Sequence, residues 1–369
     1  MEKLIPTSMM KTYTGKGIRE LPTPALVVDL PALHKNIQAM QRLVSSYGKA
    51  LRPHIKTHKC SAVALNQLKA GAIGVTCATV GEAEAMAAAG IQDILIANQI
   101  VTPDKLERLV EISKRSQSTA IKFVVDSLVG IEVAEAVAMA NGCQWEVLVE
   151  VDSGGNRCGA QSPQEAAALV RRVMESRQLR FGGIQAYNGG TSYIKDLKER
   201  ERAVAQSDHS LAQVLDEVRK VCEIPRVSGA GAGNAHFHLV DGQLTEIQSG
   251  SYVYSDTTYR ELAPEYQPAL FVLSTVISRP LASRIVMDVG LKTIGTEFSD
   301  PQLVEYPSLK EYRFSEEHVQ WQFGQEPAPK IGEKVTIIPS HCCTTVNLHR
   351  HCFAAKDGKV VDVWEIDAF

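Results

Sequence analysis

The sequence lacks the features of membrane, secreted and nucleic-acid-binding proteins. No apolar run approaches the ~20 residues that a membrane-spanning helix requires, and residues 1–20 lack the apolar core of a signal peptide. The 39 basic and 42 acidic residues nearly cancel to a net charge of -3, so no basic surface for nucleic acid is expected. The eight cysteines are spread thinly over 369 residues, unlike a disulfide framework. We therefore expect a cytoplasmic protein with neither a membrane nor a nucleic-acid partner.

What is present is a regular alternation of short apolar runs with helical patterns. The runs are residues 51–56, 71–78, 93–97, 121–125, 145–151, 181–186, 226–229 and 244–248. Parallel strands that are buried on both faces need such continuous apolar runs. Eight of them, alternating with helices, predict an α/β fold with a closed (β/α)8 TIM barrel. An open doubly wound sheet is the alternative, because periodicity alone does not show closure.

Past Tyr259 the composition changes, and Gly, Pro and β-branched residues replace the helical patterns. This change predicts a second, all-β domain. We expect residues 1–24 to be a lead-in that packs on the β domain, residues 25–264 to form the barrel, and residues 265–369 to form the β domain.

The segment Arg-Pro-His-Ile-Lys-Thr-His-Lys, residues 52–59, concentrates basic side chains at the end of the first predicted barrel strand. A lysine held among other cations and partly desolvated has a lowered pKa, and its neutral amine can form a Schiff base with a carbonyl. Lys56 is the candidate. The alternative is a solvated basic turn.

In a TIM barrel, chemistry is located at the C-terminal ends of the strands, so the residues there are candidates for a site. Polar residues follow the fifth to eighth runs, at 150–157, 185–190, 228–234 and 248–256. After the seventh run, Gly229, Gly231 and Gly233 alternate along the chain. Such spacing lets backbone N–H groups converge on a phosphate, and barrels commonly hold phosphate after strands seven and eight. A flexible turn is the alternative.

His341 and Cys343 follow a predicted strand near the end of the chain. Two residues apart on an extended segment, they would point to the same side, as two ligands of one metal must. Sulfur with imidazole favours zinc, and two ligands leave positions open for water or substrate, as in catalytic sites. The alternative is that both side chains simply pack.

Together, RPHIKTHK, GAIGVTCATVGEAEAM, EVDSGGNRCG, SGAGAGN and PSHCCTTVNLH resemble motifs of the D-threonine aldolase and D-serine dehydratase family. These enzymes of fold type III bind pyridoxal phosphate in an alanine-racemase-like barrel that precedes a C-terminal β domain. The resemblance implies that Lys56 carries the cofactor and that Arg157 contacts its phenolic oxygen. It implies a divalent metal on His341 and Cys343, zinc by preference and otherwise manganese or magnesium. The other residues implied to contact the cofactor are Tyr187, Ser228, Gly229, Gly231, Gln248 and Tyr252.

The resemblance also implies a D-amino acid as substrate and a homodimer with shared sites. Aldolases of the group usually carry His-x-Asp at the metal and a histidine after the tyrosine, whereas this chain has Cys343 and Asn188. TTVN and DVWEIDA are closer to the aldolases. We therefore expect cleavage of a D-3-hydroxy amino acid to glycine and an aldehyde, with elimination from D-serine or D-3-hydroxyaspartate to a keto acid and ammonia as the alternative.

The catalytic base is left open by the sequence. The candidates are a metal-bound water, Lys56 itself, His54 and His58. A non-enzymatic cofactor carrier of the same fold is a third hypothesis, which the predicted metal pair weakens because a carrier needs no metal.

Overall fold

The computed structural model describes residues 10–116, 118–309, 311–323 and 329–369. The chain forms two compact units, and each unit is made of several separate segments of the sequence. Of the described residues, the β unit contains 10–39, 57–62 and 251–367, apart from the gaps given above. The barrel unit contains residues 40–56, 63–250 and 368–369, again within the described ranges.

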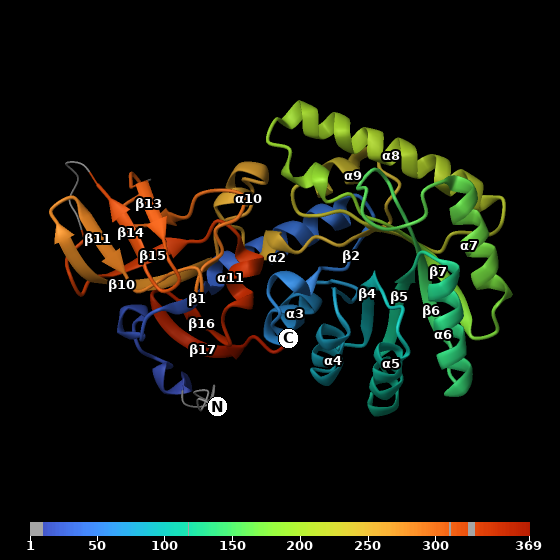
Figure 1. Ribbon diagram of the computed structural model, residues 1–369, viewed down its shortest axis with the longest axis horizontal. Helices are drawn as coiled ribbons and strands as arrows, with labels where there is room; N and C mark the ends of the chain where they lie inside the picture. The colour runs from blue at the N-terminus through green and yellow to red at the C-terminus, as the bar shows by residue number, and fades with distance from the viewer. Residues whose placement is uncertain (1–9, 117, 310, 324–328) are drawn as a thin grey trace. The chain divides into compact units, whose positions relative to one another are not determined.

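The barrel unit is built on eight parallel strands in the order β2-β9-β8-β7-β6-β5-β4-β3. Strands β4 to β7 of this sheet are labelled in Figure 1. A parallel bridge between His54 and Thr76 joins the two ends of this sheet, and the N–H of Ile73 donates to the carbonyl of Leu51 at 2.9 Å. The sheet therefore closes on itself, and the predicted (β/α)8 barrel is confirmed. The strands are β2 (Ala50–Leu51), β3 (Val75–Cys77), β4 (Asp93–Gln99), β5 (Ala120–Val125), β6 (Trp145–Val151), β7 (Leu179–Ala186), β8 (Val227–Gly229) and β9 (Glu246–Ile247).

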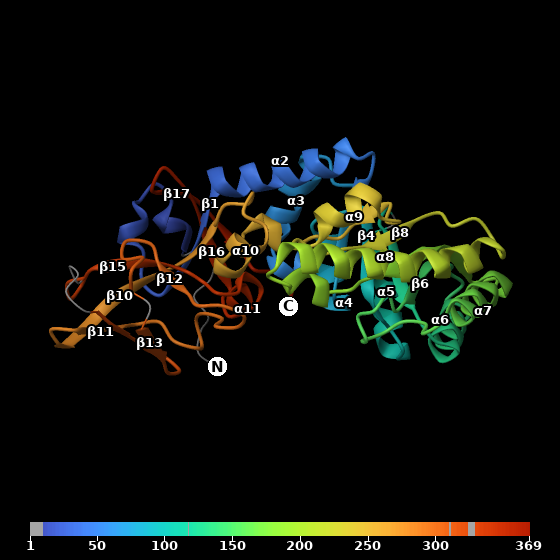
Figure 2. The same cartoon turned by 90° about the horizontal axis from the view of Figure 1, so that it is seen from above.

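The helices of the barrel unit lie outside the curled sheet (Figures 1 and 2). They include α4 (Val80–Ala88), α5 (Pro103–Arg115), α6 (Leu128–Ala140), α7 (Pro163–Glu175), α8 (Leu197–Arg219) and α9 (Ala235–Asp241), while α2 (Leu30–Ser46) and α3 (Ser61–Lys69) have residues in both units. Thr79, Ser127, Ser162 and Asp196 cap α4, α6, α7 and α8, each accepting a hydrogen bond from an N–H of the first turn. These capped helices follow the C-terminal ends of strands, where the polar residues gather.

A largely buried ionic cluster joins residues of several barrel strands. Arg52 after β2 is only 2% exposed and bonds Glu246 of β9 at 3.1 Å. It also pairs with Asp93 of β4, which accepts a bond of 2.8 Å from Lys122 of β5. A buried guanidinium needs such partners because an unpaired buried charge is strongly unfavourable. The cluster therefore ties four strands of the barrel together.

The β unit holds a nine-stranded sheet. Its strands are β1 (Ala25–Asp29), β10 (Leu270–Leu281), β11 (Arg284–Met287), β12 (Gln302–Leu303), β13 (Glu311–Phe314), β14 (Val319–Gln322), β15 (Lys334–Ile338), β16 (His351–Lys356) and β17 (Lys359–Glu365). Strand β1 pairs with β10 antiparallel and with β16 parallel. Residues 25–29 thus lie in the β sheet, whereas the sequence analysis assigned them to the barrel; hydrogen bonds on both edges hold β1 there. Residues 251–264, which include α10 (Thr257–Leu262), also belong to this unit.

The described part of the lead-in packs on the last two strands of the β unit. It forms short 3-10 helices at η1 (Lys11–Tyr13) and η2 (Ile18–Glu20), and Gly17 bridges Lys359 of β17. Met10 and Leu21 join a hydrophobic cluster with Phe353, Val360 and Val363, among others. Residues 1–9 of the predicted lead-in lie outside the described residues.

Candidate active site

Lys56 lies on a short 3-10 helix, η3 (Ile55–Thr57), after the first barrel strand. The predicted strand over 51–56 is wrong beyond Leu51 except for the single bridge at His54, since Pro53 has no N–H to donate to the sheet. The N–H of Lys56 donates to His54 Nδ1 at 3.4 Å, and the His54 side chain thereby supports the turn. The Lys56 amine lies 5.6 Å from the centre of the Tyr187 ring.

Arg157 lies in the loop after β6 and also faces Tyr187. Its guanidinium carbon is 5.2 Å from the centre of the same ring. The loop is held by Asp152, whose carboxylate accepts bonds from the N–H groups of Gly154, Gly155 and Asn156 at 2.9, 2.7 and 3.1 Å. The structure thus brings Lys56, Arg157 and Tyr187 together, from the ends of three different strands.

The glycine loop after β8 lies next to the hydroxyl end of Tyr187. A Cβ at Gly231 would be 3.6 Å from the Tyr187 hydroxyl and 2.9 Å from Ser192 Oγ. Ser192 is buried, and its hydroxyl has no hydrogen-bond partner among the described residues. A Cβ at Gly229 would meet the carbonyl oxygen of Ala186 at 1.9 Å. The glycines therefore permit close backbone approach, and a buried hydroxyl without a partner lies beside them, which fits a phosphate-binding loop.

Two other predicted cofactor residues, Ser228 and Gln248, lie in a buried hydrogen-bond network of the barrel. The Gln248 amide donates to Ser228 Oγ at 2.9 Å and to Gln185 Oε1 at 2.7 Å. Ser228 Oγ in turn donates to Glu246 Oε1 at 3.0 Å. Tyr252 is buried in the β unit, with its ring centre 5.7 Å from that of Tyr266. The cofactor roles of these three residues stay predictions.

The predicted metal pair lies in the β unit at the start of α11 (Cys342–Asn347). The expectation of an extended segment is wrong at Cys343, because His341 is the N-cap and the helix begins at Cys342. The two side chains nevertheless lie close enough for Cys343 to raise the pKa of His341. The Cys343 sulfur also contacts Thr57 Oγ1 at 3.4 Å and Ser251 Oγ at 3.6 Å.

The electrostatics of the pair suit a metal. Hydrogen bonds from Cys342, His341 and Thr57 hold the pKa of Cys343 well below its usual value, although burial opposes them. The thiolate that results is the form that binds metals. Burial would lower the pKa of His341, but Cys343 and nearby carboxylates raise it. Its buried Nδ1 has no hydrogen-bond partner among the described residues.

The metal ligands within the described residues do not reach three. No group of three or more His, Cys, Asp or Glu side chains suited to one ion occurs there. A sulfur and an imidazole are both metal ligands, but catalytic zinc sites usually carry three protein ligands, so this pair would leave more than one position for water or substrate. The donor types present are compatible with a divalent metal, whose identity they do not fix.

Sequence reasoning assigned no individual role to several residues around these clusters: Thr57 and Ser251, which lie within stretches that were singled out, and Ser192, Gln99 and Asp126, which do not. Gln99 is the last residue of β4 and Asp126 follows β5. Both could have been found by the rule that identified the other polar residues, because each stands at the C-terminal end of a predicted strand.

One family model, alanine racemase N-terminal domain, matches residues 28–258, and a second, putative serine dehydratase domain, matches residues 269–355. The chain is 37% identical to a D-threonine aldolase of Arthrobacter over 364 residues, which cover 96% of this chain and 94% of that one. It is 31% identical to a 3-hydroxy-D-aspartate aldolase of Paracoccus denitrificans, with the same coverage. The crystal structure of D-threonine aldolase from Filomicrobium marinum superposes with a TM-score of 0.92 at 34% identity, covering 96% of this chain and 98% of that one.

The barrel, the strand-rich unit and the polar clusters define an enzyme with the alanine-racemase-like fold. A D-threo-3-hydroxyaspartate dehydratase from Delftia shares this fold with a TM-score of 0.84 at 25% identity, over 95% of this chain and 98% of that one. The chain belongs to the family of D-threonine aldolases and D-serine dehydratases, which are pyridoxal phosphate-dependent lyases.

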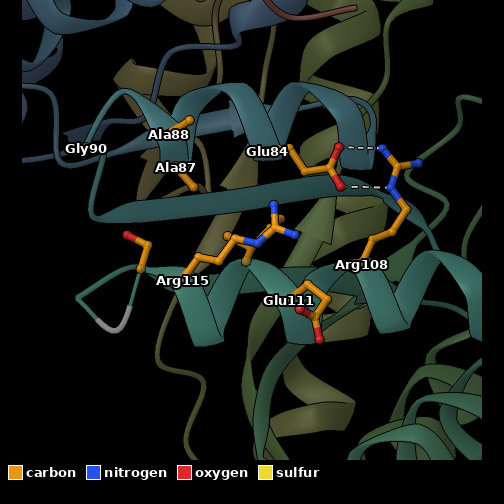
Figure 3. A pocket seen from close by; sticks show the side chains of 9 residues that line it. Glu84, Ala87, Ala88, Gly90, Arg108, Glu111 and Arg115 are labelled. Atoms are coloured by element: carbon orange, nitrogen blue, oxygen red, sulfur yellow. Dashed lines mark hydrogen bonds and ion pairs between the residues drawn. The ribbon is translucent and has the colours of Figure 1, made fainter.

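Two further observations concern parts of the chain outside the site. Within the described residues, no helix combines the length and the apolar character that crossing a bilayer requires. A cavity of about 490 Å³ lies between α4 and α5, lined by Glu84, Arg108 and Arg115 among others (Figure 3). None of the predicted site residues lines it.

Proposed function

We propose that this chain is a lyase that uses pyridoxal phosphate and a divalent metal to cleave D-3-hydroxy amino acids to glycine and an aldehyde. The proposal is carried by the arrangement around Tyr187. The Lys56 amine and the Arg157 guanidinium lie over its ring, at 5.6 and 5.2 Å, and Gly231 lies beside its hydroxyl. An amine, a cation and a glycine loop match the aldehyde, phenolic oxygen and phosphate of the cofactor.

Under this proposal, each site residue of the barrel unit has a distinct task. When bound, the cofactor supplies an electron sink for the bonds at the substrate's Cα. Lys56 Nζ would hold the cofactor through its aldehyde carbon, with the aldehyde oxygen leaving as water, and could hold a proton near the substrate's Cα. Arg157 would orient the phenolic oxygen, and Gly229 and Gly231 would let the backbone approach the phosphate. The Ser192 hydroxyl would be a further donor for that phosphate.

In the β unit, His341 and Cys343 would hold the metal, with zinc favoured and manganese or magnesium as alternatives. A metal there would polarise the substrate's β-hydroxyl as a Lewis acid. The Thr57 and Ser251 hydroxyls orient the thiolate. Thr57 directly follows Lys56 in the chain, so a hydroxyl that contacts the thiolate belongs to the residue next to the cofactor lysine.

Elimination to a keto acid and ammonia is the second candidate, with D-serine or D-3-hydroxyaspartate as substrate. Two residues favour it: Cys343, the zinc-type ligand of the dehydratases, and Asn188 in place of the histidine of the aldolases. The similarity to D-threonine aldolase over 96% of the chain favours retro-aldol cleavage. The homodimer and the cytoplasmic location stay predictions from the sequence.

Product analysis distinguishes the two reactions. The purified chain, loaded with pyridoxal phosphate and zinc or manganese, is incubated separately with D-threonine, D-serine and D-3-hydroxyaspartate, with L-threonine as control. We expect glycine and acetaldehyde from D-threonine and no turnover of L-threonine. Ammonia with a keto acid as the main products would establish elimination instead, and neither product from any substrate would refute the proposed function.

A further inference from the structure

A second polar cluster lies at the C-terminal ends of β4, β5 and β6, and the mechanism above does not use it. It consists of Gln99 at the end of β4, Asp126 after β5 and Glu150 near the end of β6. The Gln99 amide donates to Glu150 Oε2 and, at 3.0 Å, to Asp126 Oδ2. One amide therefore joins two carboxylates at the face of the barrel where chemistry is expected.

Glu150 connects this cluster to Arg157. Its side chain is 3% exposed, and the carboxylate lies 3.5 Å from the Arg157 guanidinium. A buried carboxylate without partners is unfavourable, so it holds the groups that satisfy it closely. Burial, together with the nearby Asp126, raises the pKa of Glu150 above its usual value, although Arg157 and Gln99 act to lower it. Arg157 is thus a charge partner that Glu150 needs.

The backbone on both sides of Arg157 is fixed as well. Asp152 holds the N–H groups of residues 154–156 on one side. On the other side, the N–H of Gly159 donates to Asp126 Oδ2 at 3.1 Å. Asp126 therefore bonds both the loop and the Gln99 amide that orients Glu150.

The Arg157 side chain is 55% exposed, and an exposed arginine loses considerable rotamer entropy when it is held in one position. Its guanidinium lies 3.5 Å from the Glu150 carboxylate and 5.2 Å from the centre of the Tyr187 ring. We propose that Glu150 is a positioning residue, which holds Arg157 over Tyr187 for contact with the cofactor and is itself oriented by Gln99 and Asp126. This inference rests on the proposed function, because the task of Arg157 belongs to it.

Glu150→Gln tests the proposal, since it keeps the size of the side chain and removes its charge. The dissociation constant of pyridoxal phosphate is measured by titrating the apoprotein, and the absorbance band of the bound cofactor is followed against pH. We expect the dissociation constant to rise about fivefold to tenfold. This is more than the loss of an exposed ion pair would cause and less than the loss of a fully buried one, because Glu150 is buried and Arg157 is exposed. We also expect the band to titrate at higher pH, because a less constrained guanidinium stabilises the phenolate less.

A double-mutant cycle shows whether Glu150 acts through Arg157. In the background of Arg157→Ala, Glu150→Gln should change the dissociation constant less than twofold, because the partner it positions is gone. Gln99→Met provides a second variant should Glu150→Gln fold poorly. It should change the dissociation constant and the band in the same directions, by smaller amounts, since Glu150 then loses only its orienting hydrogen bond.

The matched control is Glu84→Gln. Glu84 forms a two-bond ion pair with Arg108 on the outside of the barrel (Figure 3), so the variant should bind the cofactor as the wild type does. Unchanged affinity and band in both Glu150→Gln and Gln99→Met would overturn the positioning role. A full effect of Glu150→Gln in the Arg157→Ala background would do so too. A wild-type chain that binds no cofactor would instead overturn the proposed function, and this inference with it.

Discussion

Replacing Gly231 with alanine should weaken cofactor binding while leaving the stability of the fold nearly unchanged. The new Cβ would lie 2.9 Å from Ser192 Oγ and 3.6 Å from the Tyr187 hydroxyl. The Ser192 hydroxyl has no hydrogen-bond partner among the described residues, so rotation can relieve the contact at a cost of about 1 kcal/mol or less. The smaller entropy of the unfolded chain offsets this by about 0.4–1 kcal/mol. The free energy of unfolding should therefore change little.

Gly229→Ala is the contrasting variant in the same loop. Its Cβ would lie 1.9 Å from the carbonyl oxygen of Ala186, a residue that pairs with Gly229 between β7 and β8. Because the clash is with backbone, relief requires the strands to move by roughly 1 Å, and overpacking of this kind costs about 3 kcal/mol or more. We expect a clearly lower melting temperature for this variant.

Thermal unfolding of the apoprotein and titration with pyridoxal phosphate test both variants. Gly231→Ala should melt within a few degrees of the wild type but bind the cofactor at least about tenfold more weakly, since the methyl group fills space that the phosphate needs. Wild-type affinity in Gly231→Ala would refute the assignment of this loop to the phosphate. A wild-type melting temperature in Gly229→Ala would refute the packing argument.

Three further predictions concern other parts of the chain. Glu246→Ala leaves the buried Arg52 without one carboxylate, so urea unfolding should show a loss of about 3–5 kcal/mol, and an unchanged midpoint would contradict this. Burial lowers the pKa of His349 to about 4; stability should therefore fall by up to about 3 kcal/mol as pH drops from about 6.5 to 4, because the unfolded chain takes up the proton first. His349→Gln should remove that part of the slope, and identical slopes would contradict the assignment. Cys343→Ala or chelation should abolish turnover while pyridoxal phosphate stays bound; full activity after exhaustive chelation would exclude the metal.

The barrel was predictable because its strands are buried on both faces and therefore appear as continuous apolar runs, each followed by a helix. The sequence could not predict which sheet β1 belongs to, because Ala-Leu-Val-Val-Asp suits the interior of either sheet. Only the hydrogen bonds of β1 to β10 and β16 place it in the sheet of the β unit. The extended conformation expected at Cys343 was wrong because α11, only six residues long, shows no periodic pattern that marks its start.

The polar residues of the site also divide into those that the sequence predicted and those that it did not. Lys56 and Arg157 stand within conspicuous motifs, and the structure brings both to Tyr187. Gln99 and Asp126 are single polar residues whose neighbours carry no motif. Their relation to Glu150 becomes apparent only when β4, β5 and β6 are placed side by side. Sequence patterns thus predicted the residues that the structure gathers at Tyr187, whereas the contacts of Gln99 and Asp126 with Glu150 required the three-dimensional pairing of the strands.

Covalent trapping tests most directly whether Lys56 binds the cofactor. The chain is loaded with pyridoxal phosphate and reduced with borohydride, which fixes the cofactor on any lysine to which it is bound. Mass spectrometry of the peptides then locates the label. We predict that the label falls on Lys56 and that Lys56→Ala carries none. A label on Lys59 or another lysine in the wild type, or no label at all, would contradict the account.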